Sequence, residues 1–89
     1  MQLTIFLDIT EADSLRRMYH AASSARKAVE RAIQARDYWG SIGRDVIVEC
    51  DDRDARELAS YARSHCPSAV DKIRSAFRLA HLRRDESRL

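Results

Sequence analysis

The chain has 89 residues, of which 45% are hydrophobic and 34% charged, with a formal net charge of +2. A chain of this length holds one hydrophobic core, so we expect a single domain at 1–82 and a frayed, charged tail at 83–89. The hydrophobic fraction excludes a disordered chain, and no apolar run approaches the roughly 20 residues of a membrane span. Two cysteines are too few for a disulfide scaffold, so we expect a cytoplasmic protein with no membrane partner.

The first predicted element is a strand at Gln2–Ile9. Apolar residues alternate with the others from Leu3 to Ile9, which is the period of a strand with one buried face. Thr10 then stands at the expected N-cap of a helix, with Asp13 in capping-box spacing. The sequence therefore predicts a half-buried strand that leads directly into a helix.

This helix is predicted to run from Glu11 to Trp39, because apolar residues recur along it at intervals of three and four. At 1.5 Å per residue it is about 43 Å long and overhangs a strand of about 26 Å. Ser23-Ser24 is the one place where it could bend, since both side chains can compete for backbone hydrogen bonds. With no Gly or Pro there, we expect one continuous long helix.

The rest of the chain is predicted to form a second strand and two more helices. Gly40 and Gly43 supply a turn before a strand at Val46–Cys50. Pro67 ends the next helix near His65 and begins the last one. The predicted inner faces are Ala55, Leu58, Tyr61, Ala62 and His65, and then Val70, Ile73, Phe77 and Ala80. The order β-α-β-α-α predicts an α/β fold of the helix-rich α+β kind.

The two halves of the chain nearly repeat at a spacing of roughly 42 residues. Leu15 corresponds to Leu58 and Val29 to Val70, so the offset drifts from 43 to 41. Each half is therefore a β-α-α unit. The pattern leaves open whether the two strands run parallel or antiparallel.

A two-stranded sheet is rarely stable alone, and its edges carry unpaired backbone groups. We therefore expect self-association into a homodimer, in which two chains complete a four-stranded sheet. Tyr38 and Trp39, at the end of the long helix, are candidate interface residues, because tryptophan and tyrosine are enriched at interfaces.

Acidic side chains follow both predicted strands. If the strands are parallel, both clusters lie at one end of the sheet, where carboxylates could hold Mg²⁺ for phosphoryl transfer. Alternatively, these residues cap helices, and no Gly-rich phosphate loop accompanies them. The clusters are Asp8, Glu11 and Asp13, and Asp51, Asp52 and Asp54. We expect no metal and no cofactor.

The cysteines and histidines are predicted to be structural. His65 and Cys66 are neighbours, and neighbours on a helix point about 100° apart, which prevents a catalytic dyad. Cys50 precedes Asp51 and Asp52, whose charges disfavour a thiolate. With no catalytic constellation, we expect that the protein is not an enzyme.

The basic residues are concentrated toward the C-terminus: residues 63–89 carry seven Arg or Lys against three acids. Arg74 and Arg78 are four residues apart on the last helix, and Arg63 can join them from the helix before. Such a stripe can follow an acidic protein surface or the phosphates of a nucleic acid. We therefore add Arg63, Arg74 and Arg78 to Tyr38 and Trp39 as the candidate interaction surface.

Each half also resembles a ribbon-helix-helix unit. The resemblance rests on Thr4-Ile5-Phe6-Leu7, Leu15 and residues 24–33, and on Val46–Cys50, Leu58 and Ser68-Ala69-Val70 with Ile73. It implies a strand followed by two helices, binding to DNA as a dimer, and outward strand residues that read bases. The chain departs from the family in its predicted outward residues, three of which are acidic: Gln2, Thr4, Phe6, Asp8, Asp45 and Glu49. The glycine-containing turn between helices is also missing.

From these patterns we expect a small non-enzymatic protein-interaction or regulatory module with a protein partner. The first alternative is a ribbon-helix-helix-like regulator that binds nucleic acid. The second is a magnesium-dependent phosphoryl-transfer enzyme that uses the acidic clusters at the strand ends.

Overall fold

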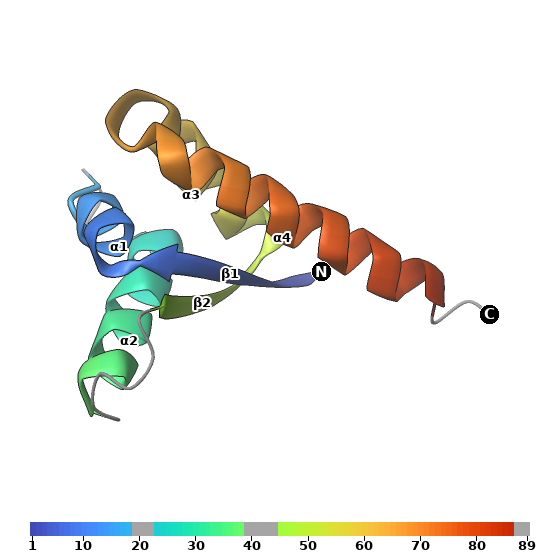
Figure 1. The fold of residues 1–89 in the computed structure, drawn as a ribbon, viewed down its shortest axis with the longest axis horizontal. Helices are drawn as coiled ribbons and strands as arrows, with labels where there is room; N and C mark the ends of the chain where they lie inside the picture. The colour runs from blue at the N-terminus through green and yellow to red at the C-terminus, as the bar shows by residue number, and fades with distance from the viewer. Residues whose placement is uncertain (19–22, 39–44, 87–89) are drawn as a thin grey trace.

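The computed structural model describes residues 1–18, 23–38 and 45–86. In chain order the elements are β1 (Gln2–Asp8), α1 (Ile9–Arg16), α2 (Ser24–Tyr38), β2 (Asp45–Asp51), α3 (Asp52–His65) and α4 (Pro67–Glu86) (Figure 1). The fold is helix-rich α+β, as the sequence predicted. Each half contributes a strand followed by two helices, which is the order that the ribbon-helix-helix resemblance implies.

The two strands pair with each other as an antiparallel ribbon. The register runs from Gln2 opposite Asp51 to Asp8 opposite Asp45. Exposed and buried residues alternate along both strands, so one face of the ribbon is covered and the other is open. The buried face consists of Leu3, Ile5, Leu7, Val46, Val48 and Cys50. The strands thus pair within one chain, and the expected homodimer stays a prediction.

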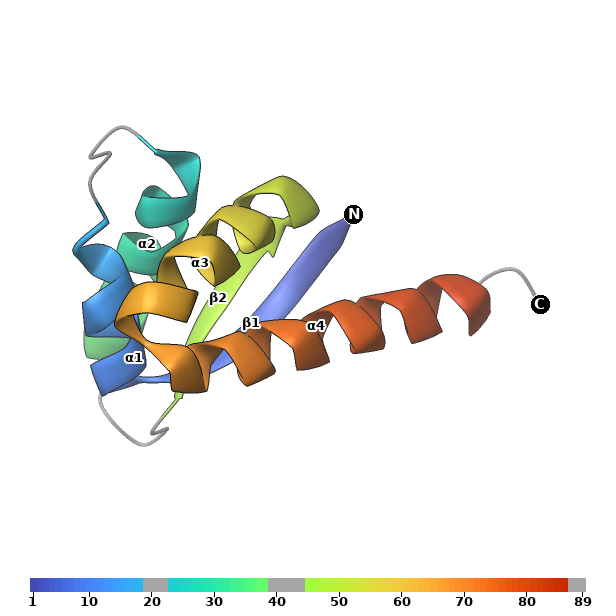
Figure 2. The same cartoon turned by 90° about the horizontal axis from the view of Figure 1, so that it is seen from above.

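The four helices share one core with the buried face of the ribbon. α2 packs against β2 and α4 against β1, while α3 contacts the other three helices. Leu15, Leu58 and Ile73 are among the largest fully buried side chains, so three of the helices meet in this core. The second half of α4 extends past the ribbon (Figure 2). It continues through Glu86, four residues into the segment that the sequence predicted to fray.

The first helix begins two residues earlier than predicted, because Asp8 rather than Thr10 is its N-cap. The Glu11 N–H donates to Asp8 Oδ1 at 2.7 Å, and the Asp8 N–H donates to Glu11 Oε1 at 3.0 Å. This is a complete capping box. Asp8 ends the strand in an extended conformation, so its carboxylate already faces the open N–H groups of the next turn.

The prediction of one continuous helix from Glu11 to Trp39 is wrong, because α1 ends at Arg16 and α2 begins at Ser24. Ser24 donates its hydroxyl to Asp54 of α3 at 2.5 Å, and Ser23 donates to Glu57 at 3.0 Å. These long-range hydrogen bonds fix the start of a separate helix. The sequence suggested instead that the two serine side chains could compete for hydrogen bonds of the helix backbone.

The boundary between α3 and α4 confirms the predicted role of proline. α3 ends at His65 and α4 begins at Pro67. His65 itself is exposed rather than on the inner face of α3, and its ring stacks on Tyr61 at a centroid distance of 4.1 Å. This contact keeps an ionisable ring at the surface and covers part of the tyrosine.

The near-repeat of the sequence becomes an approximate two-fold relationship in space. Asp51 lies 43 residues after Asp8, and it accepts from the Asp54 N–H as Asp8 does from Glu11. The ribbon register is symmetric under the same offset, with Ile5 opposite Val48 at its centre. The axis of this relationship therefore passes through the middle of the ribbon.

The second helices of the two halves correspond at an offset of 44 residues. Ala25 and Val29 of α2 are fully buried, as are Ala69 and Ile73 of α4. The predicted match of Val29 with Val70 is wrong, since Val70 is only partly buried. From the strands to the second helices, the offset between the two halves thus grows from 43 to 44 residues. The sequence comparison had indicated a decrease from 43 to 41.

Candidate functional site

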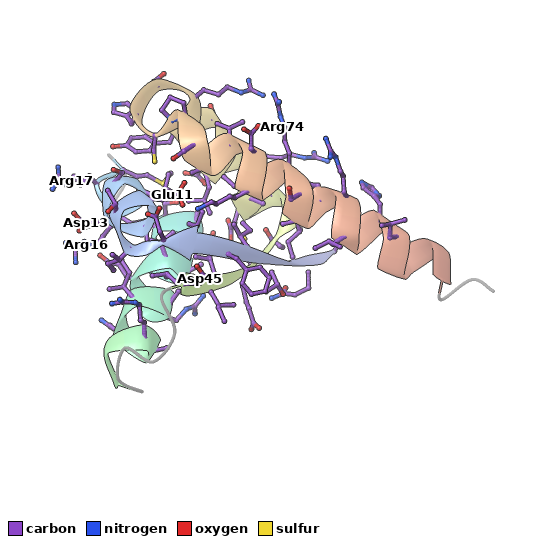
Figure 3. All side chains as sticks on the ribbon, in the orientation of Figure 1. Glu11, Asp13, Arg16, Arg17, Asp45 and Arg74 are labelled. Atoms are coloured by element: carbon purple, nitrogen blue, oxygen red, sulfur yellow. The ribbon has the colours of Figure 1, made fainter. Side chains whose placement is uncertain are left out.

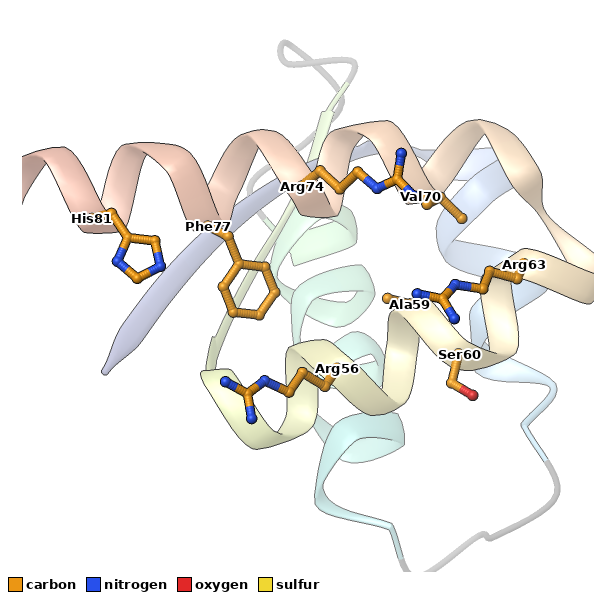
Figure 4. A pocket seen from close by; sticks show the side chains of 8 residues that line it. All are labelled: Arg56, Ala59, Ser60, Arg63, Val70, Arg74, Phe77 and His81. Atoms are coloured by element: carbon orange, nitrogen blue, oxygen red, sulfur yellow. The ribbon is translucent and has the colours of Figure 1, made fainter.

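A groove runs between α3 and α4 on the outside of the molecule (Figure 4). It has a volume of about 360 Å³. Its lining comes from both helices and consists of Arg56, Ala59, Ser60, Arg63, Val70, Arg74, Phe77 and His81.

The floor of the groove is apolar and its rim is basic. Ala59, Val70 and Phe77 are partly buried and pack on the core. The arginines on both sides are exposed. Residues three, four and seven apart share one face of a helix, and the lining residues of each helix follow this spacing. The groove is therefore the continuous outer face of two packed helices.

In the part of the chain that the structure describes, no acidic side chain lines the groove. Arg56 approaches Asp52 at 3.8 Å in an exposed pair one helical turn away, and such pairs contribute little. Among the residues that the structure describes, no carboxylate forms an ion pair with Arg63 or Arg74. Figure 4 shows Arg63 on α3 and Arg74 on α4, so the two arginines come from opposite walls of the groove. Three positive charges thus surround an apolar floor, and of these three arginines only Arg56 has a carboxylate of the described residues at ion-pair distance.

The other half of the molecule provides an internal comparison. At the offsets of 43 and 44, Arg56 corresponds to Asp13 of α1, and Arg74 corresponds to Glu30 of α2. Asp13 pairs with the neighbouring residues Arg16 and Arg17 of its own helix, at 2.6 and 3.3 Å (Figure 3).

The same holds for Glu30, which pairs with Arg26 at 3.2 Å. These two acids of the first half are therefore neutralised locally, whereas Arg63 and Arg74 form no ion pair with another described residue. The groove between α3 and α4, which we term the arginine groove after Arg56, Arg63 and Arg74, thus departs from the internal symmetry of the chain.

A polar cluster behind the groove side of α4 joins the two halves. The Glu11 side chain is 4% exposed and accepts hydrogen bonds from Lys72 and from Ser68, the latter at 2.6 Å. Burial alone raises the pKa of Glu11, but the donors from Lys72, Ser68 and the Asp8 backbone leave this pKa below its ordinary value. The hydrogen bond to Glu11 raises the pKa of Lys72. The hydrogen bonds that the Glu11 carboxylate accepts thus come from groups of the protein itself. We therefore assign this cluster a role in stability and not in ligand binding.

The structure brings together two of the five residues predicted for the interaction surface. Arg63 and Arg74 line the groove, while Arg78 is exposed on α4 outside the lining. Trp39 and the side chain of Tyr38 lie outside the described residues, so their predicted role stays a prediction.

Sequence reasoning missed Arg56 and His81. Both could have been found from helical periodicity, because Arg56 lies seven residues before Arg63 and His81 lies seven after Arg74. The sequence could not show that these two faces adjoin, since this depends on the angle at which α3 and α4 pack.

The two acidic clusters do not meet. The antiparallel register places Asp8 opposite Asp45 and Asp51 opposite Gln2, so the clusters follow opposite ends of the ribbon. The parallel arrangement on which the magnesium hypothesis depended is wrong. Within the described parts of the chain, no three His, Cys, Asp or Glu side chains form a group that could hold a metal ion.

Both cysteines are buried and unpaired. Burial, together with the charges of Asp54 and Asp51, raises the pKa of the Cys50 thiol to about 11. A thiol with this pKa is a weak nucleophile at neutral pH. This agrees with the structural role that the sequence predicted for Cys50.

No protein-family model matches the chain, and no curated protein or solved structure is significantly similar to it. No helix among the described residues is both long and apolar enough to cross a membrane. The geometry of the groove is therefore the basis on which a function can be inferred.

Proposed function

We propose that the protein is a non-enzymatic interaction module that binds an acidic, amphipathic segment of a partner protein in the arginine groove. The observation that carries the proposal is the apolar floor between three arginines that no acidic lining residue compensates. A helix with apolar residues on one face and carboxylates beside them would complement both features. The homodimer and the regulatory role predicted from the sequence remain part of this proposal as expectations.

The apolar floor supplies the anchor, and the arginines supply orientation. An exposed pair between an arginine and a carboxylate contributes only about 0–1 kcal/mol. Burial of an apolar side chain on Phe77 and Val70 contributes about 1.5–3 kcal/mol per large residue. A ligand therefore needs both kinds of contact, and a purely ionic polymer would bind weakly and with strong dependence on salt.

The apolar floor also separates this proposal from nucleic-acid binding. A phosphate backbone could pair with Arg63 and Arg74 but would leave Phe77 and Val70 without an apolar partner. In a ribbon-helix-helix protein the outward strand residues would read bases. Here Asp45 and Glu49 are exposed on the ribbon, and they would repel phosphates.

Amide NMR titrations of the isotope-labelled protein with three helical peptides test the proposal. The peptides combine leucine with glutamate, lysine or glutamine. We expect the Leu-Glu peptide to bind most tightly at the groove and to shift the amides of Arg63, Arg74 and Phe77. Equal binding of the Leu-Glu and Leu-Gln peptides would contradict the role of the arginines. Binding of an unrelated DNA duplex at the groove, without binding of the Leu-Glu peptide, would favour the nucleic-acid alternative.

A further inference from the structure

The open face of the ribbon carries a second surface with the opposite charge. Phe6 and Ile47 lie directly opposite each other in the register, and these residues are 49% and 50% exposed. Directly paired large apolar side chains that are half exposed on a sheet face are typical of an interaction site. This surface lies across the ribbon from the core and does not include the arginine groove.

Small side chains flank this apolar pair on both sides. Toward α2, the ribbon face borders a groove of about 550 Å³, whose helical wall includes Ala28, Ala32 and Ala35. Toward α4, Phe6 borders Ala76 and Ala80 beside the half-exposed Leu79. Alanine walls leave room for an incoming chain to reach Phe6 and Ile47 from above.

The ribbon face is acidic around the apolar pair. Asp8 and Asp51 cap helices, and Asp8 also approaches Lys72 at 3.8 Å. Asp45 and Glu49 are exposed, and neither forms an ion pair within the described parts of the chain. Arg31 stands on the α2 wall as a cation near this face. Lys72 is a second cation here, since it interacts with Asp45 as well as with Asp8. Among the described residues, the four carboxylates of this face nevertheless outnumber Arg31 and Lys72.

From this arrangement we infer that the open ribbon face binds a cationic segment of a partner protein, with an apolar residue seated on Phe6 and Ile47. Lysine or arginine side chains of that segment pair with Asp45 and Glu49. A phosphate backbone is repelled here, and so is the equally acidic ribbon of a second copy. The charge of the face thus specifies the partner.

The face is also asymmetric. Under the approximate two-fold, Phe6 corresponds to Glu49 and Ile47 to Thr4, so the apolar pair lies on one side of the ribbon centre and a polar pair on the other. A two-fold symmetric ligand, such as a palindromic duplex, would need both ends alike. The partner is therefore a single chain in one orientation.

The Leu-Lys peptide probes this surface independently of the arginine groove. We expect it to shift the amides of β1 and β2 around Phe6 and Ile47, whereas the Leu-Glu peptide shifts α3 and α4. In anisotropy titrations, Glu49→Lys should weaken Leu-Lys binding at least five-fold. Asp71→Lys makes the same charge change on the exposed side of α4 and should change binding less than two-fold.

Three outcomes would overturn the inference. The first is binding of the Leu-Lys peptide no tighter than the Leu-Gln peptide. The second is an equal effect of Glu49→Lys and Asp71→Lys. The third is a light-scattering mass of twice 10.2 kDa that Ile47→Ser returns to the monomer value, which would show that a second copy occupies the face. Because the two peptides report on separate surfaces, failure of this inference leaves the proposal for the arginine groove intact, and the reverse also holds.

Discussion

Ser68 donates its hydroxyl to the buried carboxylate of Glu11, with Oγ and Oε2 2.6 Å apart. The approximate two-fold repeats this contact, since Ser24 donates to Asp54 at 2.5 Å. Each serine lies at the start of the second helix of its half, which is α2 or α4. Each carboxylate lies in the first turn of the first helix of the opposite half, which is α3 or α1. A reciprocal pair of hydrogen bonds thus joins the halves in addition to the ribbon and the core.

We expect Ser24→Ala and Ser68→Ala each to lower the free energy of unfolding by about 1–2 kcal/mol. Each substitution leaves a buried carboxylate without one of its donors, which costs about 1–3 kcal/mol, while alanine returns a small gain in helix propensity. Urea denaturation followed by circular dichroism measures the change. Ser75→Ala, at an exposed position of α4, is the control and should be neutral or slightly stabilising. Equal stability of all three variants would show that the two contacts do not join the halves.

The stability of the protein should fall on acidification because of Glu11. Its pKa in the folded state lies below the ordinary value of 4.5, so its contribution is complete above about pH 4.5 and is lost as the pH falls through the folded-state pKa. Melting temperatures measured from pH 7 to pH 3 test this. Glu11→Gln should be less stable at pH 7 and should lose less stability on acidification. Glu49→Gln, at an exposed ribbon position, should retain the wild-type profile, and identical profiles for both variants would contradict the assignment.

Cys50 should react slowly with thiol reagents in the folded protein. Burial keeps the thiol protonated, with a pKa of about 11, and thiol reagents attack the thiolate. In a Cys66→Ala background, the rate of reaction with Ellman's reagent at pH 8 should be at least ten-fold lower than for the same chain in guanidinium. A similar rate in both conditions would mean that Cys50 is accessible.

Much of the fold follows from local patterns in the sequence. The alternation around Ile5 predicted the first strand, the apolar run Val46-Ile47-Val48 predicted the second, and Pro67 predicted the boundary between α3 and α4. The start of α1 was placed two residues late because Asp8 belongs to the strand pattern and to the cap at the same time. The alternating pattern assigned Asp8 to the strand alone, so its second role as the N-cap of α1 was missed.

The remaining features depend on contacts between distant parts of the chain. The start of α2 at Ser24 is fixed by its hydrogen bond to Asp54, 30 residues away. The sequence next to a serine does not show whether its hydroxyl will bind a distant carboxylate in this way. The antiparallel register likewise could not be derived from the strands themselves. The arginine groove required the packing of α3 on α4, so only Arg63 and Arg74 were identified in advance.

In the proposed function, the arginine groove, and not the general positive charge of α4, binds an acidic amphipathic segment. Titration of the Leu-Glu peptide into the wild-type protein, Arg74→Glu and Arg78→Glu tests it most directly. Both reversals change the net charge equally, and Arg74→Glu reproduces the residue type found at the corresponding position, Glu30. We predict that Arg74→Glu raises Kd at least ten-fold, or about 1.4 kcal/mol, and that Arg78→Glu raises it less than two-fold. Equal effects of the two reversals would contradict the account.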